Sequence, residues 1–161
     1  MNASDAQDIA DRIVTALAPA CERIEIAGSL RRRRPDVHDI DLVLIPRDRL
    51  DLLIRLMDLY GRKPEKIGEK YVMLKSFDGI QVDLYLATPE TWATLLLIRT
   101  GSKQHNIHLA QRANERGWRL KANGEGIDGP VDAQGAPIMM QTEADIFQTL
   151  GLPYREPWER E

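Results

Sequence analysis

The chain has 161 residues, of which 43% are hydrophobic and 29% are charged, and its formal net charge is -3. This length and composition fit one compact globular domain, and the single cysteine, Cys21, excludes an internal disulfide and a multi-cysteine zinc site. No apolar run approaches the ~20 residues of a membrane span, and the polar, acidic N-terminus lacks a signal-peptide pattern, so we expect a cytoplasmic protein without a membrane partner.

The first sixty residues alternate between helical and strand patterns. Apolar side chains at helical spacing predict two helices, the first of which opens on the capping-box pair Ser4 and Gln7. Alternating and β-branched apolar residues predict two strands. In chain order, the sequence predicts a helix over residues 5–18, a strand over 23–27, a short helical turn from Gly28, a strand over 39–46 and a helix over 47–61.

The rest of the chain begins with a hairpin and continues with helices. The stretch EKYVMLKSFDGIQVDLYLATP predicts two antiparallel strands around Asp78-Gly79, a dipeptide typical of tight turns. After it, the sequence predicts a helix from Pro89 to about Thr100, a helix from residue 102 to Gly117, a short strand and turn over 118–129, mostly loop over 122–142, and a last short helix from Glu143.

Three aspartates interrupt strand segments that otherwise hold apolar residues. Asp39 and Asp41 share one face of their strand because side chains alternate, and Asp83 alternates with apolar residues on a later strand. A solvated strand face explains an isolated Asp-x-Asp pair. If the two strands are neighbours, however, each like-charge pair ~4 Å apart costs about 4 kcal/mol at an effective dielectric of ~20. Three converging carboxylates must then share protons or bind a divalent cation.

Groups that favour phosphate precede the acidic pair. Gly28 and Ser29 lie between a predicted strand and a helical turn, where backbone N–H groups attract anions, and four arginines follow at residues 31–34. Each feature alone is common in turns and on solvated surfaces. Together with the carboxylates they form the combination that metal-bridged phosphoryl transfer needs: one region for the phosphates and one for the ions.

A basic segment follows in the second half of the chain. Arg99 to Lys121 holds six Lys or Arg residues against one acid, Glu115. These side chains form either an ordinary polar helix face or a phosphate-binding surface, and their lack of acidic partners favours the second interpretation. The predicted DNA-contacting residues are Arg112, Arg116, Arg119 and Lys121.

These motifs resemble those of the nucleotidyltransferase superfamily and, within it, the family X DNA polymerases, the polymerase-beta-like group. Three stretches resemble the signatures of that family in the same order, and the similarity covers about residues 20–158. They are GSLRRRRPDVHDIDLVLI, RTGSKQHNIHLAQRANERGWRLKANG and EADIFQTLGLPYREPWER.

The resemblance implies an α+β fold. A nucleotidyltransferase palm with a mixed, antiparallel-rich sheet would occupy residues 1–88, and a small C-terminal α/β thumb would occupy 89–161. Asp39, Asp41 and Asp83 would be the catalytic residues and would hold two Mg²⁺ ions, for which Mn²⁺ can substitute. The implied nucleotide contacts are Gly28, Ser29, Arg32, Gly101, Ser102, Lys103 and Asn106.

The activity implied is that of a minimal DNA polymerase, reduced to palm and thumb, which adds dNTPs to a primer 3′ hydroxyl. We expect a monomer that binds primer-template DNA and a nucleoside triphosphate, with a role in DNA repair. The alternative is a template-independent nucleotidyltransferase that acts on strand ends, RNA or protein, because Ile98-Arg99 replaces an aromatic pair of the family. A further alternative is an inactive DNA-binding module that retains the fold.

Overall fold

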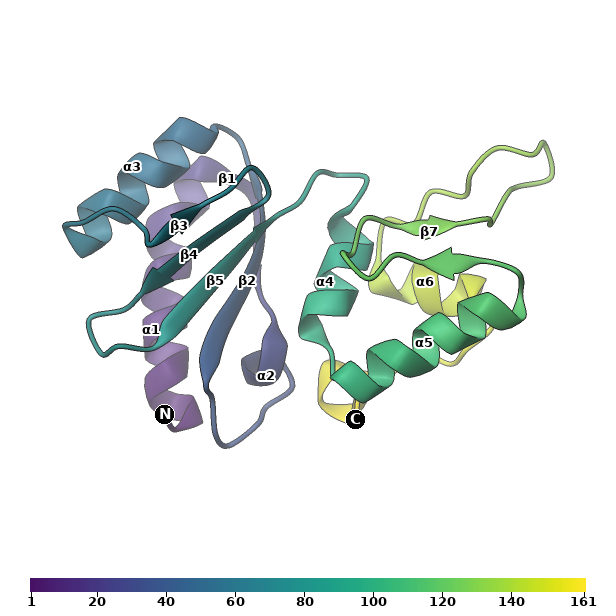
Figure 1. The fold of residues 1–161 in the computed structure, drawn as a ribbon, viewed down its shortest axis with the longest axis horizontal. Coiled ribbons are helices and arrows are strands. Elements are labelled where there is room, and N and C mark those ends of the chain that lie inside the picture. The colour runs from purple at the N-terminus through teal and green to yellow at the C-terminus, as the bar shows by residue number, and fades with distance from the viewer.

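The computed structural model describes residues 1–161 and has the α+β architecture predicted from the sequence. A five-stranded sheet carries helices on both faces, and a second group of helices with a small two-stranded sheet lies beside it (Figure 1). The α-helices are α1 (Ala3–Leu17), α2 (Gly28–Arg31), α3 (Arg49–Tyr60), α4 (Trp92–Thr100), α5 (Lys103–Glu115) and α6 (Glu143–Thr149). The strands are β1 (Cys21–Ile26), β2 (Asp39–Pro46), β3 (Lys66–Ile67), β4 (Tyr71–Lys75), β5 (Gln81–Leu86), β6 (Arg119–Leu120) and β7 (Ile127–Asp128), and short 3₁₀ helices occupy Ala18–Ala20 and Pro157–Glu159.

The large sheet is mixed and mostly antiparallel, as the sequence predicted. Its strand order is β1-β2-β5-β4-β3. Strands β2 and β5 pair in parallel, whereas β1 with β2, β4 with β5, and β3 with β4 pair antiparallel. The predicted hairpin around Asp78-Gly79 is confirmed as β4 and β5. Strand β5 therefore lies in the middle of the sheet, directly beside β2.

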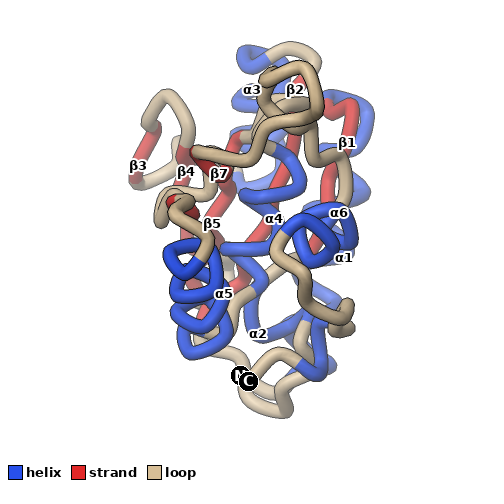
Figure 2. The backbone as a smooth tube through the Cα atoms, turned by 90° about the vertical axis from the view of Figure 1, so that its right-hand side faces the viewer, coloured by secondary structure: helices blue, strands red, loops and turns tan.

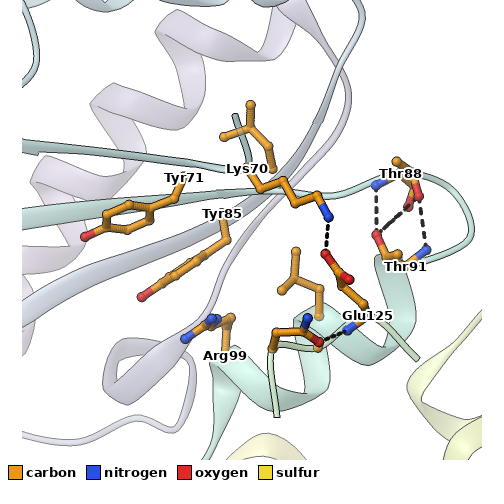
Figure 3. A pocket seen from close by; sticks show the side chains of 11 residues that line it. Lys70, Tyr71, Tyr85, Thr88, Thr91, Arg99 and Glu125 are labelled. Atoms are coloured by element: carbon orange, nitrogen blue, oxygen red, sulfur yellow. Dashed lines mark hydrogen bonds and ion pairs between the residues drawn. The ribbon is translucent and has the colours of Figure 1, made fainter. Parts of the chain in front are cut away.

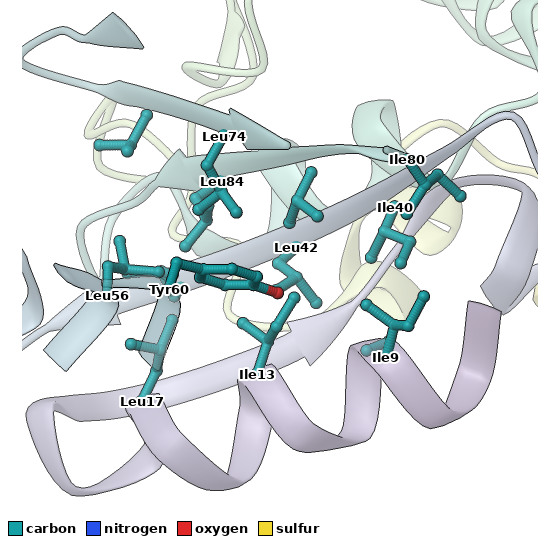
Figure 4. Close-up of a cluster of buried hydrophobic side chains, with 14 of the residues drawn as sticks. Ile9, Ile13, Leu17, Ile40, Leu42, Leu56, Tyr60, Leu74, Ile80 and Leu84 are labelled. Atoms are coloured by element: carbon teal, nitrogen blue, oxygen red, sulfur yellow. The ribbon is translucent and has the colours of Figure 1, made fainter. Parts of the chain in front are cut away.

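One face of this sheet is covered by α1 and α3 and holds the main core. Ile13 and Leu17 of α1 point at Leu42 of β2 and Leu84 of β5 (Figure 4), and all four side chains are fully buried. The apolar members of each strand alternate, so they reach this face together. The residues between them, including all three aspartates, face the opposite side of the sheet.

Helix α4 covers only part of that opposite face. Val43 and Ile45, near the end of β2, are buried against Trp92, Leu95 and Leu96 of α4. The packing leaves the first half of β2, with its acidic residues, outside the contact. The predicted domain boundary at residues 88 and 89 falls between β5 and α4 and stays a prediction, because α4 packs on the sheet.

The C-terminal elements have a hydrophobic core of their own. It is formed by α4, α5, α6 and the residues around β6, and its largest buried members include Leu97, Leu109 and Phe147. Figure 2 shows the molecule from the side of these elements. No helix has the length and apolar character that a membrane crossing requires.

Two helix starts differ from the sequence prediction. Helix α1 begins at Ala3, and Asn2 caps it by accepting a hydrogen bond from the Asp5 N–H. Helix α4 begins at Trp92 instead of Pro89. The hydroxyls of Thr88 and Thr91 accept hydrogen bonds from each other's backbone N–H groups and hold residues 88–91 in a turn. In both cases a local side-chain hydrogen bond decides where the helix starts.

Candidate active site

The parallel pairing of β2 and β5 brings the aspartates together. Asp41 is the register partner of Asp83, and Asp39 is the partner of Gln81. Neighbouring strands are about 4.8 Å apart, so Asp41 and Asp83 project side by side from the same face. Asp83 is buried and the other two acids are half-buried. The convergence predicted from the alternation is therefore present at the backbone level.

The Asp83 carboxylate is held by two neighbours on the same face. Tyr71 on β4 donates its hydroxyl hydrogen to Asp83 Oδ1 at 2.5 Å. The Gln81 amide donates to Oδ1 at 3.0 Å and to Oδ2 at 2.9 Å. Burial and the bond to Asp83 both raise the pKa of Tyr71, so the phenol remains a donor at neutral pH. Both carboxylate oxygens thus accept hydrogen bonds from the protein.

Asp41 lies in the least favourable environment for a charge. Burial, followed by the neighbouring charges of Asp39 and Asp83, raises its pKa to about 7, against the opposing effect of Arg99 and Arg32. Burial and the two neighbouring acids thus favour the protonated form of Asp41. A bound cation would relieve it.

The carboxylates fit a hard divalent cation by chemistry, because Mg²⁺ prefers oxygen ligands. No three Asp, Glu, His or Cys side chains, however, converge closely enough to hold a metal ion in this arrangement. The predicted three-aspartate metal cage is therefore not assembled here. At Asp83, hydrogen bonds from Tyr71 and Gln81 occupy three of the carboxylate's four acceptor sites.

The charge on Asp41 predicts a pH-dependent stability of the metal-free protein. Its pKa is about 7 when folded and 3.8 as the ordinary value, so the folded state binds more protons between these limits and stability falls as pH rises through them. The loss amounts to at most about 4 kcal/mol. Urea unfolding in EDTA should show up to about 3 kcal/mol of this decrease between pH 5 and pH 8 in the native protein. The Asp41→Asn variant should lose much of it and be more stable at pH 8. Equal pH dependence in both proteins would contradict the prediction.

The predicted phosphate site lies against Asp41. Gly28 begins α2 with a φ of 60°, and a Cβ added at Gly28 would collide with the Asp41 carboxylate. Two features therefore require glycine at this position: the left-handed backbone conformation and the close approach of the Asp41 carboxylate. This packing sets the Gly-Ser turn directly beside the acidic cluster.

We expect Gly28→Ala to lose more than about 1 kcal/mol in stability, because the left-handed backbone alone costs about that much and the collision with Asp41 adds to it. Gly61→Ala is the matched control, because Gly61 has a φ of 64° and nothing within 4 Å of an added Cβ. It should lose only about 1 kcal/mol in urea unfolding. Equal losses in the two variants would show that the contact with Asp41 is dispensable.

Arg32 joins the predicted phosphate site to the predicted nucleotide contacts at Gly101 and Ser102. Its guanidinium donates to the backbone oxygen of Thr100 and lies beside Gly101. The Gly101–Ser102 peptide is cis, and Ser102 caps α5 by accepting from the His105 N–H. The predicted nucleotide residues of the two halves of the chain therefore meet.

A cavity of about 380 Å³ continues from Gly101 along α5. Lys103 and Asn106 line it together with apolar side chains. The Asn106 amide donates to the Ile98 backbone oxygen at 2.9 Å, and its buried Oδ1 has no partner. The structure thus brings Gly101, Lys103 and Asn106 to one cavity, and their contacts with a nucleotide stay a prediction.

A second cavity of about 600 Å³ lies next to the aspartates, between the sheet and the turn that joins β6 and β7 (Figure 3). Tyr71 and Tyr85 form one wall, with ring centres 5.4 Å apart. The Arg99 guanidinium lies 4.0 Å from the centre of the Tyr85 ring. An ion pair between Lys70 and Glu125 crosses this cavity. Apolar and charged side chains both line this groove, and Tyr71 in its wall donates to Asp83.

Comparisons with known proteins agree with this geometry. Residues 95–161 match the family model described as DNA polymerase beta thumb. The chain is 33% identical over 138 residues to the DNA polymerase/3'-5' exonuclease PolX of Bacillus subtilis, an alignment that covers 84% of this chain and 24% of that protein. The chain belongs to family X of the DNA polymerases.

Other family X proteins are similar over parts of their length. DNA polymerase lambda of Rattus norvegicus is 26% identical over 159 residues, which is 83% of this chain and 28% of that protein. Human DNA nucleotidylexotransferase is 35% identical over 86 residues, covering 53% and 16% of the two chains. The chain spans about a quarter of the length of the first two relatives.

Most of the arginines at residues 31–34 of this family X chain contact other parts of the protein. Arg31 donates to Thr100 Oγ1 at 2.8 Å and pairs with Glu143 at 2.6 Å. Arg33 lies 3.7 Å from the centre of the Trp158 ring, and Arg34 pairs with Glu161. The interpretation of these three as polyanion-binding groups stays a prediction, and each of them already contacts a residue of the C-terminal half of the chain. Arg32 alone faces the acidic cluster.

The predicted DNA contacts divide in the same way. Arg112 pairs with Glu115 at 3.1 Å and donates to the Leu150 backbone oxygen, and Lys121 pairs with Asp128 at 3.4 Å. Arg116 donates to the Thr149 backbone oxygen. The premise that these cations lack acidic partners was therefore wrong for Arg112 and Lys121. Arg116 and Arg119 have no acidic partner. Their DNA contacts stay a prediction.

Sequence reasoning missed four residues that support the site. Tyr71 and Gln81 donate to Asp83, Glu143 pairs with Arg31 of α2, and Arg160 pairs with Glu143. The alternation on β5 could have indicated Gln81, which shares the face of Asp83. The others depend on strand register or on contacts between distant segments.

Proposed function

We propose that the protein is a nucleotidyltransferase that adds a deoxynucleotide to a DNA primer. The oxygen of the 3′ hydroxyl bonds to the α-phosphorus of a dNTP, the bond to the β-phosphate breaks, and pyrophosphate leaves. The observation that carries the proposal is the register pairing of Asp41 with Asp83 on an open sheet face, beside the meeting point of Arg32 and Gly101.

Two groups of residues would take part in this reaction, one that holds metal ions and one that holds the nucleotide. Asp39, Asp41 and Asp83 would hold divalent ions, which when bound supply the positive charge that offsets the triphosphate. Ser29 and Arg32 would hold the phosphates, while Lys103 and Asn106, which line the 380 Å³ cavity, would face the base. Asp83 would accept a hydrogen bond from the primer hydroxyl and orient it. A role in DNA repair is part of this proposal.

Primer extension tests the proposal. We expect Mg²⁺-dependent addition of the complementary dNTP to a primer on gapped or recessed DNA. rNTPs should be tried in parallel, because Ile98-Arg99 stands before the sugar site. Absence of extension on every DNA structure, with a protein that is folded by circular dichroism, would overturn it.

Template-independent addition is the second candidate. Arg99 favours it, since its side chain faces the open 600 Å³ cavity and its Nε lacks a hydrogen-bond partner. Extension of single-stranded DNA and of primer-template by each of the four dNTPs distinguishes the two activities. Equal yields for all four nucleotides, with and without a template base, would establish non-templated transfer.

A further inference from the structure

We propose that Tyr71 is a positioning residue that occupies Oδ1 of the Asp83 carboxylate, so that this oxygen can ligate a metal only when the hydrogen bond is given up. The inference rests on the proposed function, because it takes Asp83 to be a metal ligand. It concerns the state before metal and substrate bind. The carrying observation is the 2.5 Å hydrogen bond from the Tyr71 hydroxyl to Asp83 Oδ1, on the sheet face where the register of β2 and β5 brings the acids together.

The position of Tyr71 follows from the β4–β5 register. Tyr71 is the partner of Tyr85, and Asp83 is the partner of Met73, so the phenol reaches Asp83 diagonally on the same face. The Tyr71 and Tyr85 rings lie at 37° to each other, with their hydroxyl groups extending in a similar direction (Figure 3). The Lys66 ammonium lies 5.9 Å from the centre of the Tyr71 ring. The ring is thus held from two sides.

The bond from Tyr71 competes directly with metal ligation. Asp83 is 4% exposed, and its Oδ1 accepts from both Tyr71 and Gln81 while Oδ2 accepts from Gln81. A carboxylate oxygen must direct a free lone pair at a cation to ligate it. A hydrogen bond to a charged group changes an equilibrium by about ten- to hundred-fold. Holding Asp83 therefore weakens metal binding by about that factor.

Tyr85 provides a matched control within the same wall. It projects from the strand beside Tyr71, has the same hydroxyl group and lines the same cavity. The hydroxyl of Tyr71 bonds to Asp83, whereas that of Tyr85 has no hydrogen-bond partner in the protein. Removing each hydroxyl separates a direct effect on Asp83 from a general change in the polarity of the wall.

The experiment is a Mn²⁺ titration of the full chain, followed by electron paramagnetic resonance of the free ion, without nucleotide or DNA. We expect Tyr71→Phe to bind Mn²⁺ about ten-fold more tightly than the native protein, and Tyr85→Phe to stay within two-fold. The gain should disappear in the double variant Tyr71→Phe, Asp83→Asn. Unchanged or weaker binding by Tyr71→Phe, or a gain that persists without Asp83, would overturn the proposal.

Failure of this inference and failure of the proposed function are distinguishable. If the native protein extends primers and Tyr71→Phe binds Mn²⁺ like the native protein, the positioning role alone is wrong. If no DNA is extended but Tyr71→Phe gains Mn²⁺ affinity through Asp83, the positioning role holds for a metal site with another activity.

Discussion

The Asp83→Asn variant is expected to lose primer extension by at least about a thousand-fold, which corresponds to roughly 4 kcal/mol of transition-state stabilisation. Asparagine keeps the size of the side chain but removes the negative charge that would hold a divalent ion, and it orients a hydroxyl less strongly. The loss should appear in the maximal rate at saturating dNTP, measured in single-turnover extension.

Two further measurements decide what the loss means. The variant should unfold in urea at least as late as the native protein, because one of three clustered charges is gone. Glu22→Gln removes the same charge from an exposed position on β1 and should retain activity within about two-fold. Extension by Asp83→Asn within ten-fold of the native rate would remove Asp83 from the catalytic group.

The Arg160→Ala variant is expected to lose about 3–5 kcal/mol of folding stability. Arg160 is completely buried, pairs with Glu143 at 2.5 Å and donates twice to the Arg155 backbone oxygen. Without it, the buried Glu143 carboxylate keeps only Arg31 as a partner. Urea unfolding followed by circular dichroism gives the free energy.

Arg34→Ala is the control for this second change. Arg34 also pairs with a C-terminal acid, Glu161, but both side chains are substantially exposed. An exposed pair contributes less than about 1 kcal/mol. If the two variants were equally stable, burial would not be what gives the contacts of Arg160 their energy.

The sheet and its acids could be predicted because they depend on local patterns. Alternation places Asp39 and Asp41 on one face wherever the strand lies, and the Asp78-Gly79 turn defines the next two strands. The arginines could not be predicted in this way. Arg31 is paired with Glu143, 112 residues further along the chain, and no local pattern encodes such a contact.

The state of the acids was equally beyond sequence reasoning. Whether the Asp83 carboxylate accepts a hydrogen bond from Tyr71 depends on a diagonal contact between β4 and β5. That contact requires the register of the β4–β5 hairpin. A shift of that register by one residue would turn the phenol to the other face. Patterns therefore identify which strands carry the site, whereas cross-strand packing decides how its side chains are arranged.

The parallel contact between β2 and β5 also sets an order of events during synthesis. The ribosome releases Asp39 and Asp41 well before Asp83, and in the completed sheet β5 lies between β2 and β4. Early in translation the first two acids would have no neighbour on that edge of β2. The acidic cluster cannot form before β5 has paired with β2, and the same pairing brings Leu84 into the core against α1.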